Sequence, residues 1–276
     1  MSREGRSGGA LSVALSLLAT AASGETVTLR TPASEVVRLP ALELDLGSTP
    51  AEVQEAVAEC AREPLVERCS ESSFENELPI QRVLVPAFYL QRREVTVKEY
   101  DRCVVVGACT RAGYAERPRY ARPNLPATFV TFDQAATYCR FRGMRLPTEA
   151  EFERAARGAS RRRYPWGQLY NSRVANHGRL GIDTSDDSDG FAEMAPVGSF
   201  PAGRTPEGVL DLAGNVAEWV EGTYRHPSGA ALSGVRVLRG GSYRDAAPWL
   251  RSAARVPAER ELAAPFAGFR CARNAR

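Results

Sequence analysis

The stretch that decides the fold is residues 143–153, Gly-Met-Arg-Leu-Pro-Thr-Glu-Ala-Glu-Phe-Glu. Thr148 and Glu151 stand three positions apart, the spacing of a capping box, in which each side chain accepts a hydrogen bond from the other residue's backbone amide. The box predicts a helix from residue 149 to about residue 157. Gly158 follows and ends it, because glycine is the usual residue just past a helix C-terminus.

Regular secondary structure is sparse on either side of this stretch. Asp133 is placed to cap a helix through residues 135–139, and Thr49-Pro50 predicts the start of a helix over residues 51–57. Short strands are predicted at residues 27–29, 36–39, 83–85 and 87–90. A few helices among loops and short strands favour the α+β class, since a doubly wound α/β fold needs regular alternation of strands and helices.

Composition excludes several function classes. The chain has 276 residues, of which 43% are hydrophobic and 25% charged, as in an average globular protein. Its net charge of +3 gives no electrostatic reason to bind nucleic acid or an anionic membrane. With two histidines the chain cannot form a three-histidine metal site, and it contains neither a phosphate-binding P-loop nor a Gly-x-Ser-x-Gly nucleophile motif.

Residues 1–21 are predicted to be a signal peptide, followed by a lead-in at residues 22–34. Arg3 and Arg6 precede an apolar run over residues 10–19, and Ala-Thr-Ala then provides a small-x-small cleavage site. The run is too short to span a bilayer, and an uncleaved amphipathic start is the alternative. No later segment resembles a transmembrane helix, so the mature protein is predicted to be secreted or periplasmic.

The cysteines are predicted to form disulfides, because this compartment is oxidising and their number, six, is even. Spacing favours two local pairs and one long-range pair: Cys60 with Cys69, Cys103 with Cys109, and Cys139 with Cys271. Six cysteines allow 15 pairings. The alternative is that the last two are free thiolates in a site for a soft metal.

A series of motifs then resembles the formylglycine-generating enzyme family, also called the sulfatase-modifying factor family. Besides residues 143–153, the motifs are Tyr-Pro-Trp-Gly at 164–167, Ala-Pro-Val-Gly-Ser-Phe at 195–200, Asp-Leu-Ala-Gly-Asn-Val-Ala-Glu-Trp at 211–219, Arg-Gly-Gly-Ser-Tyr at 239–243 and Gly-Phe-Arg-Cys at 268–271. Weaker matches lie at residues 46–48 and 94–96. The resemblance implies one domain over residues 35–275, with a variant of the C-type lectin fold and structural Ca²⁺ ions.

Two calcium sites follow from the resemblance. In the first, Asn176 and Asp189 supply side-chain oxygens and His177 and Phe191 supply backbone carbonyls. Calcium prefers such mixed oxygen ligands. The alternative is that the acidic segment leading to Asp189 is only a solvated loop.

The second implied site has side-chain oxygens from Asn215 and Glu218, with backbone help from Gly214 and Val216. Its alternative is that Glu218 pairs with an arginine instead of a metal.

The chain departs from the family at the copper site. Members that make formylglycine bind Cu(I) through two cysteine thiolates just after the Arg-Gly-Gly-Ser motif, and the metal activates O₂ to oxidise a substrate cysteine. Asp245 and Leu250 occupy those two positions here. Copper is therefore not expected as a cofactor, and oxidase activity is predicted to be absent.

Two functions remain. The first is a binding or accessory module that recognises a peptide, protein or small-molecule ligand in a surface cleft, since loops of this scaffold vary widely. The residues predicted to line that cleft are Ser242, Tyr243, Asp245, Trp249 and Arg251. The second is a protein-modifying enzyme of the formylglycine-generating type, which oxidises a cysteine in a sulfatase-like substrate.

Overall fold

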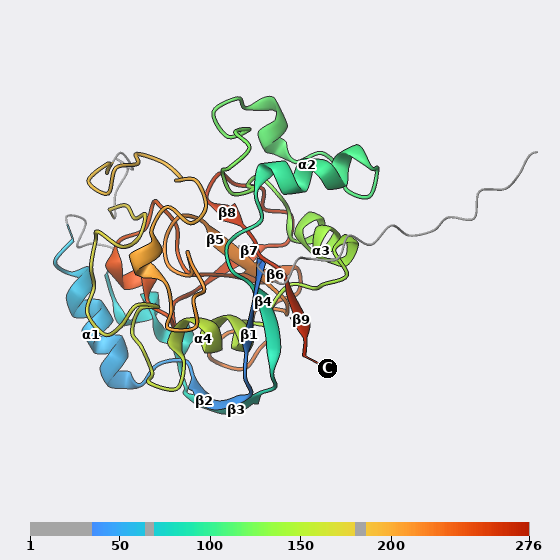
Figure 1. Ribbon diagram of the computed structural model, residues 1–276. Coiled ribbons are helices and arrows are strands. Elements are labelled where there is room, and N and C mark those ends of the chain that lie inside the picture. Colours follow the sequence, from blue (N-terminus) through green and yellow to red (C-terminus); the bar gives the residue numbers. More distant parts are fainter. Residues whose placement is uncertain (1–34, 64–68, 180–185, 276) are drawn as a thin grey trace, which may run out of the picture.

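The computed structural model describes residues 35–63, 69–179 and 186–275 (Figure 1). The predicted signal peptide, the lead-in and the strand expected at residues 27–29 lie outside the described residues. Within them, no helix is long and apolar enough to cross a membrane.

In the described part of the chain, four α-helices each begin with a threonine capping box. They are α1 (Pro50–Cys60), α2 (Val97–Val105), α3 (Phe132–Phe141) and α4 (Glu149–Arg157). Their N-caps are Thr49, Thr96, Thr131 and Thr148, and each accepts a hydrogen bond from the backbone amide three residues later. The prediction that Asp133 is the N-cap of α3 is therefore wrong. Thr131 takes that role, because Gln134 completes its box.

The strands are short and form three small sheets. They are β1 (Val36–Leu39), β2 (Leu42–Leu46), β3 (Gln81–Val85), β4 (Phe88–Gln91), β5 (Ala217–Val220), β6 (Val235–Arg239), β7 (Arg255–Glu259), β8 (Ala267–Gly268) and β9 (Ala272–Asn274). The sheet orders are β1-β4-β9, β2-β3 and β7-β6-β5-β8. Strand β8 pairs in parallel with β5, which places the 268–271 motif beside the 211–219 motif. The α+β class with little regular structure is confirmed.

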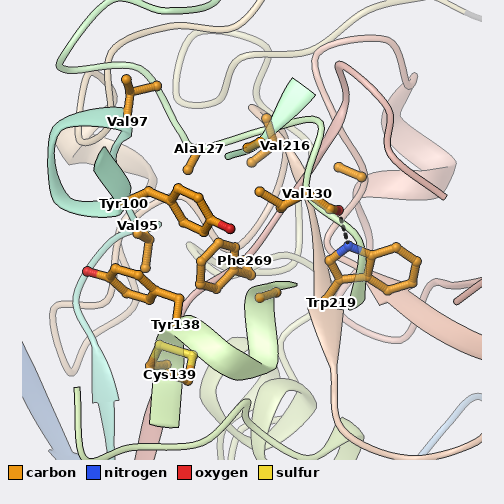
Figure 2. Close-up of a cluster of buried hydrophobic side chains, with 14 of the residues drawn as sticks. Val95, Val97, Tyr100, Ala127, Val130, Tyr138, Cys139, Val216, Trp219 and Phe269 are labelled. Atoms are coloured by element: carbon orange, nitrogen blue, oxygen red, sulfur yellow. Dashed lines mark hydrogen bonds between the residues drawn. A yellow bond between two sulfur atoms is a disulfide. The ribbon is translucent and has the colours of Figure 1, made fainter. Parts of the chain in front are cut away.

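The main core is aromatic and lies between α2, α3 and the last strands (Figure 2). The ring of Tyr138 lies 5.7 Å from that of Tyr100 and 5.4 Å from that of Phe269. Trp219 on β5 is fully buried, and its indole nitrogen donates to the carbonyl of Val130 at 3.0 Å. This core joins the middle of the chain to its C-terminal motifs.

Three disulfides join the pairs that the spacing predicted. Cys60–Cys69 closes a loop after α1, and Cys103–Cys109 closes the end of α2. Cys139–Cys271 links α3 to the C-terminal segment across 132 positions and is buried beside the aromatic core. None of the cysteines among the described residues is free, so the soft-metal alternative for the last pair is excluded in this structure.

Candidate functional site

Asp245 closes a turn instead of presenting a metal ligand. Its carboxylate accepts hydrogen bonds from the backbone amide of Ser242 at 2.8 Å and from the Ser242 hydroxyl at 2.7 Å. Its backbone carbonyl accepts from the amide of Gly178 at 3.0 Å. Burial raises the pKa of Asp245, while the bonds from Ser242 oppose the rise. The carboxylate is thus committed to holding this loop together.

Leu250 places an apolar side chain at the second of the two positions where the family's copper-binding cysteines are expected. It ends the 3₁₀-helix η7 (Ala247–Leu250), is fully buried, and packs with Tyr164, Trp166 and Tyr170. The rings of Tyr164 and Trp166 stack at 5.3 Å, so the Tyr-Pro-Trp-Gly motif forms one wall of this cluster. A leucine here offers no electron pair to a metal.

An N-terminal segment covers η7 from outside. This segment, called the cap below, consists of residues 49–63 and 69–78 and includes α1 and the 3₁₀-helices η3 (Glu71–Ser73) and η4 (Glu75–Glu77). The Phe74 ring lies 5.2 Å from the Trp249 ring. Glu77 accepts from both terminal nitrogens of Arg251, at 2.9 and 2.6 Å, and both side chains are buried.

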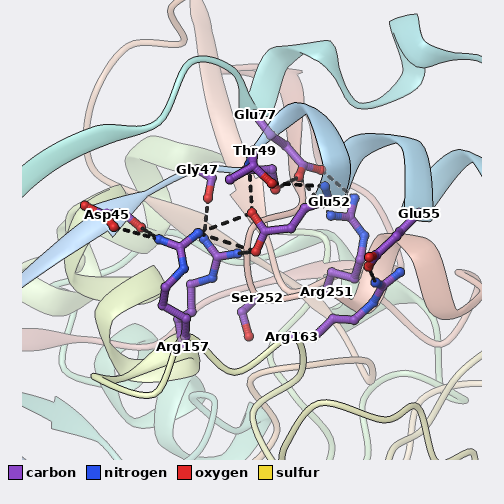
Figure 3. Close-up of polar contacts among 12 residues, drawn as sticks. Asp45, Gly47, Thr49, Glu52, Glu55, Glu77, Arg157, Arg163, Arg251 and Ser252 are labelled. Carbon is purple, nitrogen blue, oxygen red and sulfur yellow. Dashed lines mark hydrogen bonds and ion pairs between the residues drawn. The ribbon is translucent and has the colours of Figure 1, made fainter.

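Further ion pairs join the cap to the end of α4 and to the loop that follows it (Figure 3). Arg163 donates to Glu55 at 2.6 Å and to Glu59 at 2.8 Å, and Arg157 donates to Glu52 at 2.7 Å. Hydrogen-bonded ion pairs and apolar packing both attach the cap to the rest of the domain. The cap is therefore an integral part of the domain.

The residues predicted to line a cleft are mostly buried. Ser242, Tyr243 and Arg251 are buried, with 1%, 4% and 3% of their surface exposed. Trp249 is half-buried against the cap, and Asp245 is bound to Ser242. These side chains contact the neighbouring loops and the cap, and Arg251 also lines a small cavity of about 70 Å³ together with Glu52 and Arg163.

Three of the four residues predicted for the first calcium site are joined by hydrogen bonds, through backbone amides and not through the carbonyls that were expected as ligands. The carboxylate oxygens of Asp189 accept from the amides of His177 at 2.8 Å and Phe191 at 2.9 Å. Asn176 donates through Nδ2 to the carbonyl of Glu193 at 2.9 Å, which leaves its Oδ1 buried without a hydrogen-bond partner. Burial raises the pKa of Asp189. An unpartnered buried amide oxygen and a carboxylate are both oxygen ligands of the kind that Ca²⁺ prefers.

The second calcium set does not fit a metal as named. Both oxygens of Glu218 accept from Arg270, at 2.7 Å each, and both residues are buried. Asn215 Oδ1 accepts from the amide of Ala195 at 2.9 Å and from Asn176 Nδ2 at 3.3 Å. The expected ligand role of Glu218 is thus corrected in favour of the ion pair with arginine.

The backbone carbonyls of Gly214 and Val216 were expected to complete that second set. Gly214 has a φ of +81°, and a Cβ added there would lie 2.0 Å from the carbonyl oxygen of Asn176. Only glycine fits at position 214, so the tight turn accounts for Gly214 without a role in binding a metal. Val216 packs in the main core. No group of three or more histidines, cysteines, aspartates or glutamates able to hold a metal occurs among the described residues.

Sequence reasoning missed the buried polar network around Arg270. Glu94 accepts from Asn215 Nδ2 at 2.9 Å, and burial together with the charge of Asp211 raises its pKa well above the usual value. Arg270 also donates to the carbonyls of Leu210 and Asp211, at 2.9 and 3.0 Å. The sequence could have indicated this network, because Glu94, Asp211 and Arg270 all lie within the motifs that resemble the family.

Comparison with known proteins indicates the same family as the motifs do. Residues 30–275 match the Sulfatase-modifying factor enzyme 1-like domain family. Over 159 residues the chain is 39% identical to "Inactive C-alpha-formylglycine-generating enzyme 2" of Mus musculus, covering 55% of this chain and 50% of that protein. Over 193 residues it is 36% identical to the formylglycine-generating enzyme of Mycobacterium tuberculosis, covering 60% and 64%. The chain thus spans about half to two thirds of these relatives.

A solved structure extends the similarity over most of the chain. PvdO from Pseudomonas aeruginosa superimposes with a TM-score of 0.66 at 28% identity, covering 87% of this chain and 94% of that one. The family match takes in the aromatic core, the Cys139–Cys271 bridge and both calcium sets. This chain belongs to the family of sulfatase-modifying factor enzyme 1-like domains.

Proposed function

We propose that this chain is a binding or accessory domain that recognises a peptide, protein or small-molecule ligand and does not carry out copper-dependent oxidation. The proposal rests on the identity and contacts of the residues at positions 245 and 250. Cu(I) selects soft sulfur ligands, whereas Asp245 is a hard carboxylate bound to Ser242 and Leu250 is an apolar side chain in an aromatic cluster. The cap packs on η7 through Trp249 and Arg251, and Leu250 is fully buried.

The competing function is cysteine oxidation of the formylglycine-generating type, as the name of the Mycobacterium tuberculosis relative describes for that protein. The mouse relative is named inactive, so relatives on both sides of this division resemble the chain. The side chains at positions 245 and 250 favour the non-oxidase role.

Purified protein is expected to bind Cu(I) no more tightly than an Asp245→Ala variant, because the wild-type chain has no thiolate pair to lose. A competition titration against a chromogenic Cu(I) chelator measures this. With a cysteine-containing sulfatase peptide, copper and a reductant, O₂ consumption should stay at the rate of the protein-free control. Stoichiometric Cu(I) binding accompanied by peptide oxidation would overturn the proposal in favour of the enzyme.

We also propose one structural Ca²⁺ per chain, held by Asn176, Asp189 and the carbonyls of His177 and Phe191. The unpartnered Oδ1 of Asn176 and the buried carboxylate of Asp189 support it. The ion would neutralise the carboxylate and cross-link the loop before residue 179 to the loop at Asp189, in a part of the chain with little regular secondary structure.

Chelation with EGTA is expected to lower the melting temperature of the wild-type protein. A ligand that binds only the folded state stabilises it by about 2.7 kcal/mol at a hundredfold excess over Kd. Asp189→Ala should abolish the response to EGTA, which scanning calorimetry with and without chelator measures. Asp186→Ala is the control and should keep the response, because Asp186 is not among the proposed ligands; its carboxylate faces Arg179 at 3.0 Å and the His177 ring at 3.8 Å. Identical wild-type melting curves in calcium and in EGTA would rule the site out.

We also propose that the protein is exported to an extracytoplasmic compartment. The leader-like first 21 residues and three disulfides support it, because disulfides persist in oxidising compartments.

A further inference from the structure

A hollow of about 570 Å³ lies between the outer face of α2 and the loop that carries Pro123. The other residues that line it share one face of the helix and its continuation: Lys98, Asp101, Arg102, Val105 and Val106. Helix α2 lies at the edge of the domain, away from α1 of the cap (Figure 1). Sites for small ligands usually measure about 300–1,000 Å³, so the hollow is large enough for one.

The lining of the hollow is open to solvent and has an apolar part. Val105 and Val106 are 85% and 61% exposed, and Lys98, Arg102 and Pro123 are exposed as well. A ligand can therefore reach all of these side chains. Contact with a hydrocarbon chain would remove the two neighbouring valines from water, which is favourable.

The hollow keeps its shape without a ligand. On its opposite side, α2 buries Tyr100 and Cys103 in the main core, and the disulfide from Cys103 to Cys109 closes the end of the helix. The amide of Lys98 donates to the carbonyl of Pro123 at 3.1 Å, which fixes the loop against the start of the helix. Such preorganisation lowers the entropic cost of binding.

The hollow offers no backbone donor to a peptide. The backbone amides from Val97 to Val106 donate within the helix or to the neighbouring loop, and Pro123 has no amide proton. An extended peptide placed here would lose water from its carbonyls without gaining backbone donors in return, which is costly. A hydrocarbon chain carries no such groups, so the apolar part of the hollow suits a chain and not a peptide backbone.

Two positive charges at the hollow have no partner. Lys98 and Arg102 are four positions apart, so they are neighbours on the helix surface, where like charges destabilise one another. Neither forms an ion pair with a residue in the described part of the chain. Asp101 also lines the hollow, but its carboxylate accepts from the Tyr114 hydroxyl at 2.7 Å. Because two cations face one carboxylate, the net charge of the lining favours an anion.

We propose that this hollow binds an aliphatic carboxylate, a hydrocarbon chain that ends in a carboxylate group. The chain lies against Val105, Val106 and Pro123, and the carboxylate binds between Lys98 and Arg102. A guanidinium can donate to both carboxylate oxygens, and an ammonium adds a second charge. The inference rests on the proposed binding role, for which it names a ligand class and a site that contains neither position 245 nor position 250.

Ligand-observed NMR titration of the full chain tests the head group with three probes that share one chain length. Octanoate is the anion, 1-octanol is the neutral analogue and octylammonium is the cation. Octanoate should bind about tenfold or more tightly than either analogue, because only its head group accepts from both cations. Hexanoate should bind about two- to fourfold more weakly than octanoate for each methylene group removed.

Glutamine substitutions separate the charges from the apolar stems of the same side chains. Lys98→Gln combined with Arg102→Gln should weaken octanoate binding by about tenfold or more and leave 1-octanol binding unchanged. Arg140→Gln is the matched control and should change neither, because Arg140 is exposed on α3 and donates to Thr137 at 2.8 Å. Asp101→Asn should tighten octanoate binding by about two- to fivefold, since it removes a negative charge near the carboxylate.

Serine substitutions test the apolar part. Val105→Ser combined with Val106→Ser should weaken the binding of octanoate and of 1-octanol alike. Leu84→Ser is the control, because Leu84 is 69% exposed on β3 and lies outside the hollow.

The proposal is overturned if octanoate does not bind, if 1-octanol or octylammonium binds as tightly, or if the double glutamine variant binds octanoate like the wild type. Association with phosphatidylglycerol vesicles without binding of octanoate would also overturn it, in favour of a membrane contact. Failure of octanoate to bind a copper-inert protein refutes this site alone, whereas copper-dependent peptide oxidation refutes the proposed function.

Discussion

Replacing both Cys139 and Cys271 with alanine is expected to destabilise the protein by about 5 kcal/mol, because the bridge closes a loop of 132 positions in the unfolded chain. The loop-entropy relation gives this value, and longer loops gain more from closure. Both cysteines are buried in the aromatic core, so alanine replaces them without introducing a buried polar group. Urea unfolding monitored by tryptophan fluorescence measures the change.

The matched control is Cys103→Ala with Cys109→Ala. That bridge closes only 6 positions, so the same relation gives a loss of about 2 kcal/mol. An equal loss for the two double variants would show that loop closure does not govern the effect. A wild-type midpoint unchanged by a reducing agent would contradict the prediction more directly.

Arg270→Met is expected to destabilise the protein by about 3–5 kcal/mol, the range for breaking a buried ion pair from one side. Arg270 is fully buried and is the countercharge for Glu218, and its charge also acts on Glu94 and Asp211. Without the guanidinium, several backbone carbonyls lose a donor as well, including those of Leu210 and Asp211. Urea unfolding again provides the measurement.

Arg273→Met controls for the loss of one arginine near the C-terminus. Arg273 is exposed and stacks over the Tyr89 ring at 4.1 Å, so its loss should cost about 1 kcal/mol or less. Adding Glu218→Gln to Arg270→Met should recover part of the stability, since it removes a buried charge left without a partner. A loss of less than 1 kcal/mol for Arg270→Met would mean that the network is dispensable.

Local sequence signals predicted local structure well. The box of Thr148 and Glu151 located α4, and Thr49 located α1, because a capping box needs only residues three positions apart. The same reasoning reached α3 but selected Asp133 as its cap, since Gln134 as the partner of Thr131 was overlooked. Helix α2 was not predicted, although Thr96 and Glu99 carry the same signal.

Long-range contacts decided the candidate site. Glu218 has the same sequence context whether it binds calcium or Arg270, and only the pairing of β5 with β8 brings Arg270 within 2.7 Å. Trp249 was expected to line a surface cleft, but its ring packs against Phe74. The cap that buries it comes from a segment more than 170 positions earlier in the chain.

The sequence by itself determined the family, through ordered motifs, and the loss of the copper ligands, since the identities of residues 245 and 250 do not depend on the fold. It also determined the starts of α1 and α4 and the two short disulfide loops, whose partners are neighbours in the chain. Only the tertiary structure decided which polar groups are satisfied. Arg251 and Glu77 meet across 174 positions and Asn76 and Arg255 across 179, and no local pattern encodes such pairs. Burial makes each unpaired polar group costly, so whether a group such as Asn176 Oδ1 finds a partner depends on contacts that only the folded chain creates.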